Sequence, residues 1–413
     1  MAELIERKVY IDQIKGFVDS EQIKVITGIR RCGKSEVLKL IKQEILKKTD
    51  EEHIIFLNFE DYEHVDLLNP KNLHDYIISK IKNNEKYYVF LDEIQKVEDW
   101  EKVVSSLRLR NTDIYITGSN AQLLSGELAT LIAGRYVSFE IHTLSFSEFL
   151  QFRKTCLLEK SESFINDEGE IYEYIKIGGF PLLSTKSFTQ EEARKIIIDI
   201  ESSAVLKDVV ERNKIKNVPL LQRIIAFVYD NVGSLISLTK IANYLKSNGG
   251  GADFETISSY IGYLENACII KKVSRYDIKG KKLLESNDKY YLADHSLQYT
   301  IREMKKTNIS GILENIVYNE LIRRGYKVYV GKMSGSDDRE IDFIAEKNNG
   351  DEKIYVQVCY EYGSKETMDR EFTPLTEIKD HFPKYVVTLD KLWNESRNGV
   401  TGIHLTDFLL KEL

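Results

Sequence analysis

The chain has few of the residues and patterns that mark several classes of protein. Of its 413 residues only 5 are Pro and 4 are Cys. The cysteines, Cys32, Cys156, Cys268 and Cys359, lie too far apart for a CxxC metal site and are too few for a disulfide scaffold, so we expect a reducing, cytoplasmic setting. No apolar run approaches the roughly 18 residues that a membrane helix needs, and the first residues mix charges of both signs. The sequence therefore predicts neither membrane insertion nor secretion.

The chain also lacks an excess of positive charge. It has 58 Lys and Arg and 65 Asp and Glu, which gives a net charge of −7. This balance argues against a protein that coats nucleic acid through its overall charge. Two segments are rich in basic residues, at 207–216 and 271–282. Each could form a local nucleic-acid-binding surface, and the alternative is that both are ordinary solvated surface. The chain is 42% hydrophobic and 30% charged, which predicts folded domains, and its length suggests two to four of them.

The order of apolar and amphipathic segments predicts three domains. Strand-length apolar segments alternate with helical patterns through the first 145 residues, as in a parallel sheet with crossover helices. The expected strands are residues 23–27, 53–59, 87–91, 113–117 and 136–141. Helical periodicity then dominates to about residue 285, after which strand patterns return in a second α/β unit. We therefore expect domains at residues 1–150, 151–290 and 291–413.

Residues 28–35 read GIRRCGKS and match G-x-x-x-x-G-K-[ST] at every fixed position. An apolar strand precedes the motif and a helical pattern follows it, as a phosphate-binding loop requires. Gly28 and Gly33 let the backbone curl so that N–H groups point at phosphate oxygens. Lys34 would reach the β- and γ-phosphates, and the Ser35 hydroxyl would bind Mg²⁺. The predicted ATP contacts are Gly28, Ile29, Arg30, Arg31, Cys32, Gly33, Lys34, Ser35 and Glu36.

A second motif, YYVFLDEIQ, ends a predicted strand with two carboxylates. Asp92 is the expected Mg²⁺ ligand, and Glu93 is the expected group that polarises the attacking water. After the next strand, Ser119 or Asn120 could orient that water, although a polar turn explains them equally well. Arg135, before the last strand, is a candidate for the nucleotide site of its own or a neighbouring subunit, and a surface arginine is the simpler alternative. The predicted catalytic residues are Lys34, Glu93, Asn120 and Arg135.

Residues 237–274 predict two short helices, a turn and a following strand, the pattern of a winged helix at about residues 232–276. The second helix would face a DNA groove, but it carries no Arg or Lys there. Base recognition favours Arg, Lys, Asn or Gln. We therefore expect this region to contact protein, with specific DNA binding as the alternative. The side chains that the second helix offers are Glu255, Ser258, Ser259, Tyr260 and Glu265.

Several separated segments resemble one known family. They are GIRRCGKS, LDEIQKVEDWEKVV, ITGSNAQLLS, AGRYVSFEIHTLSFSEFL and GGFPLL, followed by YLADHSL, GILENIVYNELIRRGYKVYV and REIDFIAE. In this order they are similar to bacterial and archaeal AAA-type ATPases that carry a C-terminal domain of unknown function. The resemblance covers nearly the whole chain. It implies an α/β P-loop NTPase core of the AAA/ASCE type, a winged-helix middle domain and a C-terminal restriction-endonuclease-like α/β domain.

Metal-dependent nucleases of that fold need an acidic residue at one strand end, a second on the next strand and a lysine two residues later. The acidic residues are present here in Glu314, on a predicted helix, and in Glu340 and Asp342. In the resembled family the next strand more often ends in E-V-K, whereas this chain has Gln357 and Cys359 at those places. A cysteine cannot replace the lysine cation. We therefore predict a degenerate, inactive nuclease site.

Together these motifs predict an ATPase that uses ATP and Mg²⁺. It would couple turnover to a protein or DNA partner through the middle and C-terminal domains, and it could act as a homo-oligomer. Two other functions stay open at this point. One is a nucleotide-gated binding module with little turnover, and the other is a metal-dependent nuclease.

Overall fold

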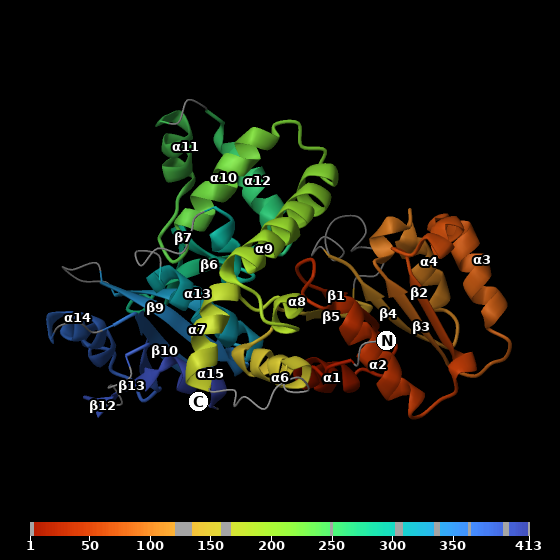
Figure 1. Cartoon of the computed structure of the whole chain (residues 1–413), viewed down its shortest axis with the longest axis horizontal. Coiled ribbons are helices and arrows are strands. Elements are labelled where there is room, and N and C mark those ends of the chain that lie inside the picture. The colour runs from red at the N-terminus through yellow and green to blue at the C-terminus, as the bar shows by residue number, and fades with distance from the viewer. Residues whose placement is uncertain are drawn as a thin grey trace. The chain divides into compact units, whose positions relative to one another are not determined.

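The computed structural model describes residues 4–119, 134–157, 167–247, 251–301, 309–333, 339–361, 365–390 and 396–411. The chain divides into two compact units (Figure 1). One unit comprises Met1–Thr143 with Asn266–Cys268, and the other comprises Leu144–Glu265 with Ile269–Leu413. Among the described residues, no helix combines the length and apolar character that crossing a membrane requires.

The first unit is built on a parallel five-stranded sheet in the order β2-β3-β4-β1-β5. Its strands are β1 (Ile23–Thr27), β2 (Ile54–Asn58), β3 (Tyr87–Asp92), β4 (Thr112–Thr117) and β5 (Tyr136–Glu140). The accompanying helices are α1 (Lys8–Lys15), α2 (Lys34–Leu46), α3 (Pro70–Lys80) and α4 (Trp100–Leu107). This sheet confirms the parallel α/β architecture predicted from the sequence.

Two of the three inner strands of this sheet, β1 and β3, are buried over their whole length. Every residue of β1 and β3 is buried, which explains why these segments are continuous apolar runs instead of alternating ones. The buried side chains of α3 and α4, such as Leu73 and Val104, belong to one core cluster with Val25 and Val89 of the strands. The core therefore holds the strand ends in fixed positions along one edge of the sheet.

The second unit begins with helices and continues into a mixed eight-stranded sheet, in the order β12-β13-β11-β10-β9-β8-β6-β7. The helices are α6 (Phe146–Leu157), α7 (Asp167–Ile177), α8 (Pro181–Ser184), α9 (Gln190–Ala204), α10 (Val218–Asp230), α11 (Leu238–Ser247), α12 (Phe254–Asn266), α13 (Ile309–Arg323), α14 (Lys365–Thr376) and α15 (Leu405–Leu410). The strands are β6 (Ile270–Asp277), β7 (Lys282–Leu292), β8 (Lys327–Met333), β9 (Arg339–Lys347), β10 (Glu352–Cys359), β11 (Lys384–Thr388), β12 (Ser396–Arg397) and β13 (Val400–His404).

The boundary predicted near residue 290 falls inside β7, within this sheet. The hairpin of β6 and β7 follows α12, as expected, but β6 also pairs in parallel with β8, for example Arg275 with Val330. The residues assigned to a middle and a C-terminal domain therefore lie in one compact unit. Local patterns could not reveal this, because the pairing joins segments more than fifty residues apart.

Segments that carry the family resemblance meet in the interior of the second unit. The Gly179 N–H donates to Asp294 Oδ2 at 2.9 Å, and the Leu144 N–H donates to the Gly179 carbonyl at 2.7 Å. Gly178 has φ +81°, and a Cβ there would lie 2.3 Å from Asp294 Oδ1. The GGFPLL and YLADHSL segments thus need two glycines and a buried aspartate to pack together.

Candidate nucleotide-binding site

The loop between β1 and α2 requires glycine at both of its fixed positions. Gly28 has φ +140°, and a Cβ on it would lie 2.2 Å from the carbonyl oxygen of Ile141. Gly33 has φ +102° and caps the N-terminus of α2. Both conformations are in the left-handed region that favours glycine. The loop therefore leads into a helix N-terminus, where unpaired N–H groups and the helix dipole attract phosphate.

Lys34 is the first residue of α2, and only 5% of it is exposed. Its ammonium donates to the carbonyl oxygens of Gly28 at 3.0 Å and Ile29 at 3.3 Å. The cation therefore lies against the loop that it follows, where it would meet phosphate oxygens. Ser35 is partly buried beside it, and Glu36 is exposed on the first turn of the helix.

Two carboxylates stand at the carboxyl end of β3, at the same edge of the sheet as the loop. Asp92 is the last residue of that strand and is 1% exposed, while Glu93 is 7% exposed with φ +56°. Gln95 Nε2 donates to a carboxylate oxygen of Glu93. Parallel strands bring their carboxyl ends to one edge, where ligands bind in α/β folds of this kind.

Thr117, the last residue of β4, is a residue that the sequence prediction missed. Its hydroxyl donates to Asp92 Oδ1 and accepts from the backbone N–H of Glu93 at 2.9 Å. Because β4 lies between β1 and β3, one buried hydroxyl fixes both acidic residues. The prediction looked beyond the strand instead, to Ser119, which is buried, and to Asn120, which lies outside the described residues.

A second missed residue is Arg7, which is buried in the first unit. Its guanidinium donates to the carbonyl of Cys32 in the loop at 2.9 Å and to the carbonyl of His142 at 3.0 Å. The guanidinium carbon lies 4.6 Å from the centre of the Tyr10 ring. Arg7 therefore ties the phosphate-binding loop to the segment after β5. No local signal indicates this, because the partners lie 25 and 135 residues away.

Arg135 lies at the opposite end of the sheet from the loop. It is exposed, and its carbonyl accepts from the N–H of Ile23, the first residue of β1. Ile23 and Thr27, the last residue before the loop, are four residue steps apart along β1, and at about 3.3 Å per step this amounts to about 13 Å. Arg135 is therefore not brought into the nucleotide site of its own chain, while its action on a neighbouring subunit stays a prediction.

The second unit holds a different polar cluster, in which Lys289 of β7 lies among three carboxylates. Its ammonium is 2.8 Å from Glu314 of α13, 2.6 Å from Glu340 and 3.4 Å from Asp342 of β9. Burial alone would lower the pKa of Lys289, but these carboxylates raise it above its ordinary value. Burial, with the nearby Asp342 charge, raises the pKa of Glu314 to about 7.

The other two residues of the predicted nuclease site make different contacts. Gln357 accepts from the N–H of Asp342 at 3.2 Å and donates to Glu371 at 3.0 Å. Burial, assisted by the Glu371 charge, raises the pKa of the Cys359 thiol to about 12, so the thiol is protonated at neutral pH. In the part of the chain that the structure describes, no group of three or more His, Cys, Asp and Glu residues is placed to hold a metal ion. Glu314, Glu340 and Asp342 lie together around Lys289, a residue that the prediction did not include.

Residues 20–150 match the model of an AAA domain, and residues 168–308 match that of a domain of unknown function (DUF8612). An uncharacterized protein of Haemophilus influenzae is 40% identical over 412 residues, 99% of each chain. An uncharacterized protein of Methanocaldococcus jannaschii is 33% identical over 374 residues, covering 87% of this chain and 78% of that protein. The Walker-type ATPase PABY2304 of Pyrococcus abyssi matches over 72% of this chain and 96% of its own, with a TM-score of 0.53 and 15% identity, which is a likeness of fold.

Proposed function

Because this chain belongs to one family with the Haemophilus influenzae and Methanocaldococcus jannaschii proteins and carries an AAA domain, we propose that it binds ATP with Mg²⁺ and hydrolyses it. One observation carries the proposal. The loop that begins at Gly28 lies at the same edge of one parallel sheet as Asp92 and Glu93, which are both hydrogen-bonded to Thr117. Phosphoryl transfer needs this combination of a phosphate cradle, a metal ligand and a group that orients water.

Each residue of the site has a distinct role in this proposal. Lys34 and the N–H groups at the start of α2 would bind the phosphates. Ser35 and Asp92 would hold Mg²⁺, which neutralises charge on the β- and γ-phosphates when it is bound. Glu93 would orient the attacking water, and its hydrogen bond from Gln95 limits the directions in which its carboxylate can point.

The second unit is the proposed site of coupling to a partner. We interpret residues 232–276, which hold α11, α12 and nearly all of β6, as a winged helix and residues 291–413 as a restriction-endonuclease-like domain. The exposed surface of α12 carries Glu255 and Ser258, which supports a protein partner over base recognition. Nuclease activity is not favoured, because the Lys289 ammonium lies where a metal ion would have to meet the carboxylates.

If the protein forms a homo-oligomer, Arg135 would contact the nucleotide bound to a neighbouring subunit.

The test compares nucleotide binding and ATP hydrolysis in the wild type and in two variants. Lys34→Ala should lose detectable binding. Glu93→Gln should keep binding but hydrolyse about 100-fold more slowly or worse, the usual contribution of a positioned base. Glu98→Gln, at an exposed glutamate close by in the sequence, should behave as the wild type.

Two results would reject parts of the proposal. Wild-type hydrolysis by Glu93→Gln would remove Glu93 from the mechanism. A wild type that binds Mg-ATP but hydrolyses it no faster than the reaction without protein would instead support a nucleotide-gated binding module.

A further inference from the structure

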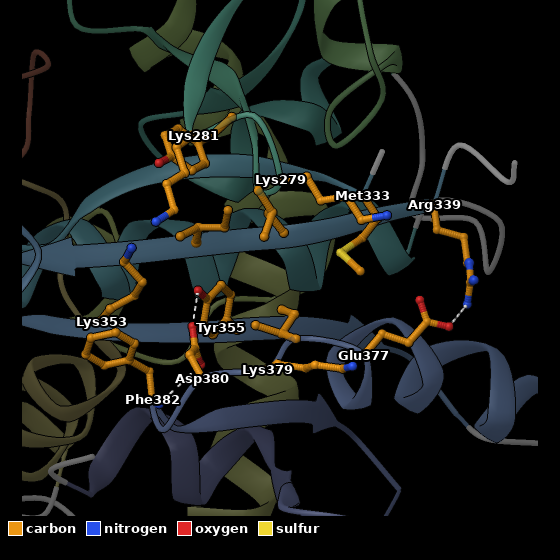
Figure 2. A pocket seen from close by; sticks show the side chains of 14 residues that line it. Lys279, Lys281, Met333, Arg339, Lys353, Tyr355, Glu377, Lys379, Asp380 and Phe382 are labelled. Atoms are coloured by element: carbon orange, nitrogen blue, oxygen red, sulfur yellow. Dashed lines mark hydrogen bonds and ion pairs between the residues drawn. The ribbon is translucent and has the colours of Figure 1, made fainter. Parts of the chain in front are cut away.

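A groove of about 900 Å³ lies in the second unit and shares no residue with the nucleotide site or with the Lys289 cluster (Figure 2). Its floor is the face of the sheet that carries Tyr276 of β6, Met333 of β8, Ile344 of β9 and Tyr355 of β10. The turn after β6 and residues 377–382, which follow α14, form its sides. The volume is within the range of roughly 300–1,000 Å³ that is typical of ligand sites.

The lining of the groove has an excess of positive charge. Its cations are Lys279, Lys281, Arg339, Lys353 and Lys379, and its carboxylates are Glu377 and Asp380. Both carboxylates already have partners. Glu377 pairs with Arg339 at 2.7 Å, and Asp380 accepts from Tyr355 Oη at 2.7 Å and from Lys384 at 3.0 Å. The lysines of the groove are thus left without a carboxylate inside it.

Two of these lysines face each other. Figure 2 shows Lys281, from the turn after β6, and Lys353, from β10, reaching toward one another from opposite sides of the groove. The nearest ion pair of Lys353 is with Glu346 at 3.6 Å, and no described contact pairs Lys281 with an acidic residue. Two like charges that converge repel each other, so an anion between them would be stabilised. The pair therefore indicates an anionic ligand.

The aromatic side chains decide which kind of anion fits. Tyr276 on the floor and Phe382 on the side of the groove are partly exposed, and the Lys353 ammonium lies 5.7 Å from the centre of the Phe382 ring. A groove with cations along it and ring faces between them suits single-stranded nucleic acid, because phosphates meet the cations and bases stack on the rings. An acidic peptide would use the lysines but would not stack on the exposed part of the Tyr276 ring, whose other neighbour is the Tyr329 ring, at 5.7 Å between ring centres.

We propose that this groove binds a short stretch of single-stranded nucleic acid. Lys281 and Lys353 contact its phosphates, and Tyr276 stacks on a base. The groove shares no residue with the ATP site, so binding of the oligonucleotide can be measured without ATP. A failure of this proposal is therefore distinguishable from a failure of the proposed ATPase function.

The experiment measures fluorescence anisotropy of a labelled oligothymidine of about 20 nucleotides at several salt concentrations. The Lys281→Gln/Lys353→Gln double variant should bind about tenfold more weakly or worse. It should also lower the slope of log affinity against log salt by about 1.4, since each phosphate contact to a single strand contributes about 0.7. Lys71→Gln, at an exposed lysine in the first turn of α3, is the matched control and should bind as the wild type.

A second variant separates stacking from charge. Tyr276→Leu keeps an apolar side chain on β6 but removes the ring, so we expect about tenfold weaker binding with an unchanged salt slope. Far-UV circular dichroism and thermal melting check that each variant folds.

Three results would overturn the proposal. One is wild-type affinity in the lysine double variant. Another is equal binding of a duplex together with no effect of Tyr276→Leu, which would indicate a general basic surface. The third is binding of a labelled polyglutamate peptide without binding of the oligonucleotide, which would assign the groove to an acidic protein segment.

Discussion

The Lys289 ammonium lies 2.8 Å from the carboxylate of Glu314, and both side chains are buried. One comes from β7 and the other from α13, so the ion pair joins the sheet to the helix that follows it. Tyr291 also donates to Glu314 from the same strand. With Glu340 and Asp342 close by, the lysine supplies a cation that offsets the repulsion among three carboxylates.

Replacing Lys289 with Met should therefore destabilise the protein and do so in a pH-dependent way. Removing one partner of a buried ion pair typically costs about 3–5 kcal/mol, because the remaining charge is uncompensated. The pKa of Glu314 is already raised to about 7, so the folded protein is stabilised when this carboxyl is protonated. That contribution to the free energy of unfolding is complete below the ordinary pKa of a glutamate and is lost as the pH rises through about 7. Without the lysine that pKa rises further, and the loss of unfolding free energy should be larger at about pH 8 than at about pH 5.

Urea denaturation at the two pH values measures this effect. Lys272→Met, which removes the half-exposed pair of Lys272 with Asp288, is the control and should cost less than about 1 kcal/mol. An equal loss for Lys289→Met at both pH values would contradict the assigned role of the carboxylates.

A second buried pair, between Lys24 and Asp113 in the first unit, predicts a similar loss of stability. Neither side chain is exposed, and Asp113 also accepts hydrogen bonds from the Asp19 N–H and the Tyr115 hydroxyl. Lys24→Met should cost about 3–5 kcal/mol, since it leaves a buried carboxylate unpaired. Adding Asp113→Asn removes that charge but keeps an acceptor, so the double variant should be more stable than Lys24→Met in urea denaturation. A double variant of lower stability would reject this explanation.

The first unit was predictable because its signals are local. The strands expected at residues 23–27 and 136–141 correspond to β1 (Ile23–Thr27) and β5 (Tyr136–Glu140). Buried parallel strands are continuous apolar runs, and the residues that bind phosphate and metal follow directly after them. Lys34 and Asp92 could therefore be located from the sequence alone.

The buried cations could not be predicted from the sequence, because their partners are distant along the chain. Lys289 lies 25 residues from Glu314 and 53 from Asp342, and Arg7 reaches a loop carbonyl 25 residues away. In the sequence, a lone lysine next to an apolar segment or an arginine near the N-terminus resembles an ordinary surface residue. Only the pairing of strands and helices brings these cations into the interior, where burial gives them their roles.

The hydroxyl of Thr117 gives a prediction about catalysis. Thr117→Val keeps the side-chain shape but removes the hydrogen bonds that fix Asp92 and the backbone of Glu93. We expect ATP hydrolysis to fall by about 10- to 100-fold, the scale of effect that misplaced catalytic groups produce, with a smaller change in ATP affinity. Thr117→Ser, which keeps the hydroxyl, should stay near the wild-type rate. Equal hydrolysis rates for the Val variant and the wild type would show that Thr117 does not position the acidic residues.

The close approach of Gly28 to Ile141 predicts that one added methyl group disrupts the loop. A Cβ at Gly28 would lie 2.2 Å from the Ile141 carbonyl oxygen and 3.0 Å from Cys32 Sγ, in a backbone conformation with φ +140°. Gly28→Ala should therefore displace the loop, destabilise the protein by about 1–3 kcal/mol and weaken ATP binding at least about tenfold. Gly16→Ala is the matched control, because Gly16 has φ −66° and nothing lies within 4 Å of its added Cβ. That change should raise stability by about 0.4–1 kcal/mol through the unfolded state and leave ATP binding unchanged. If thermal melting and ATP titration gave the same values for the two alanine variants, steric contact with Ile141 could not be the reason for glycine at position 28.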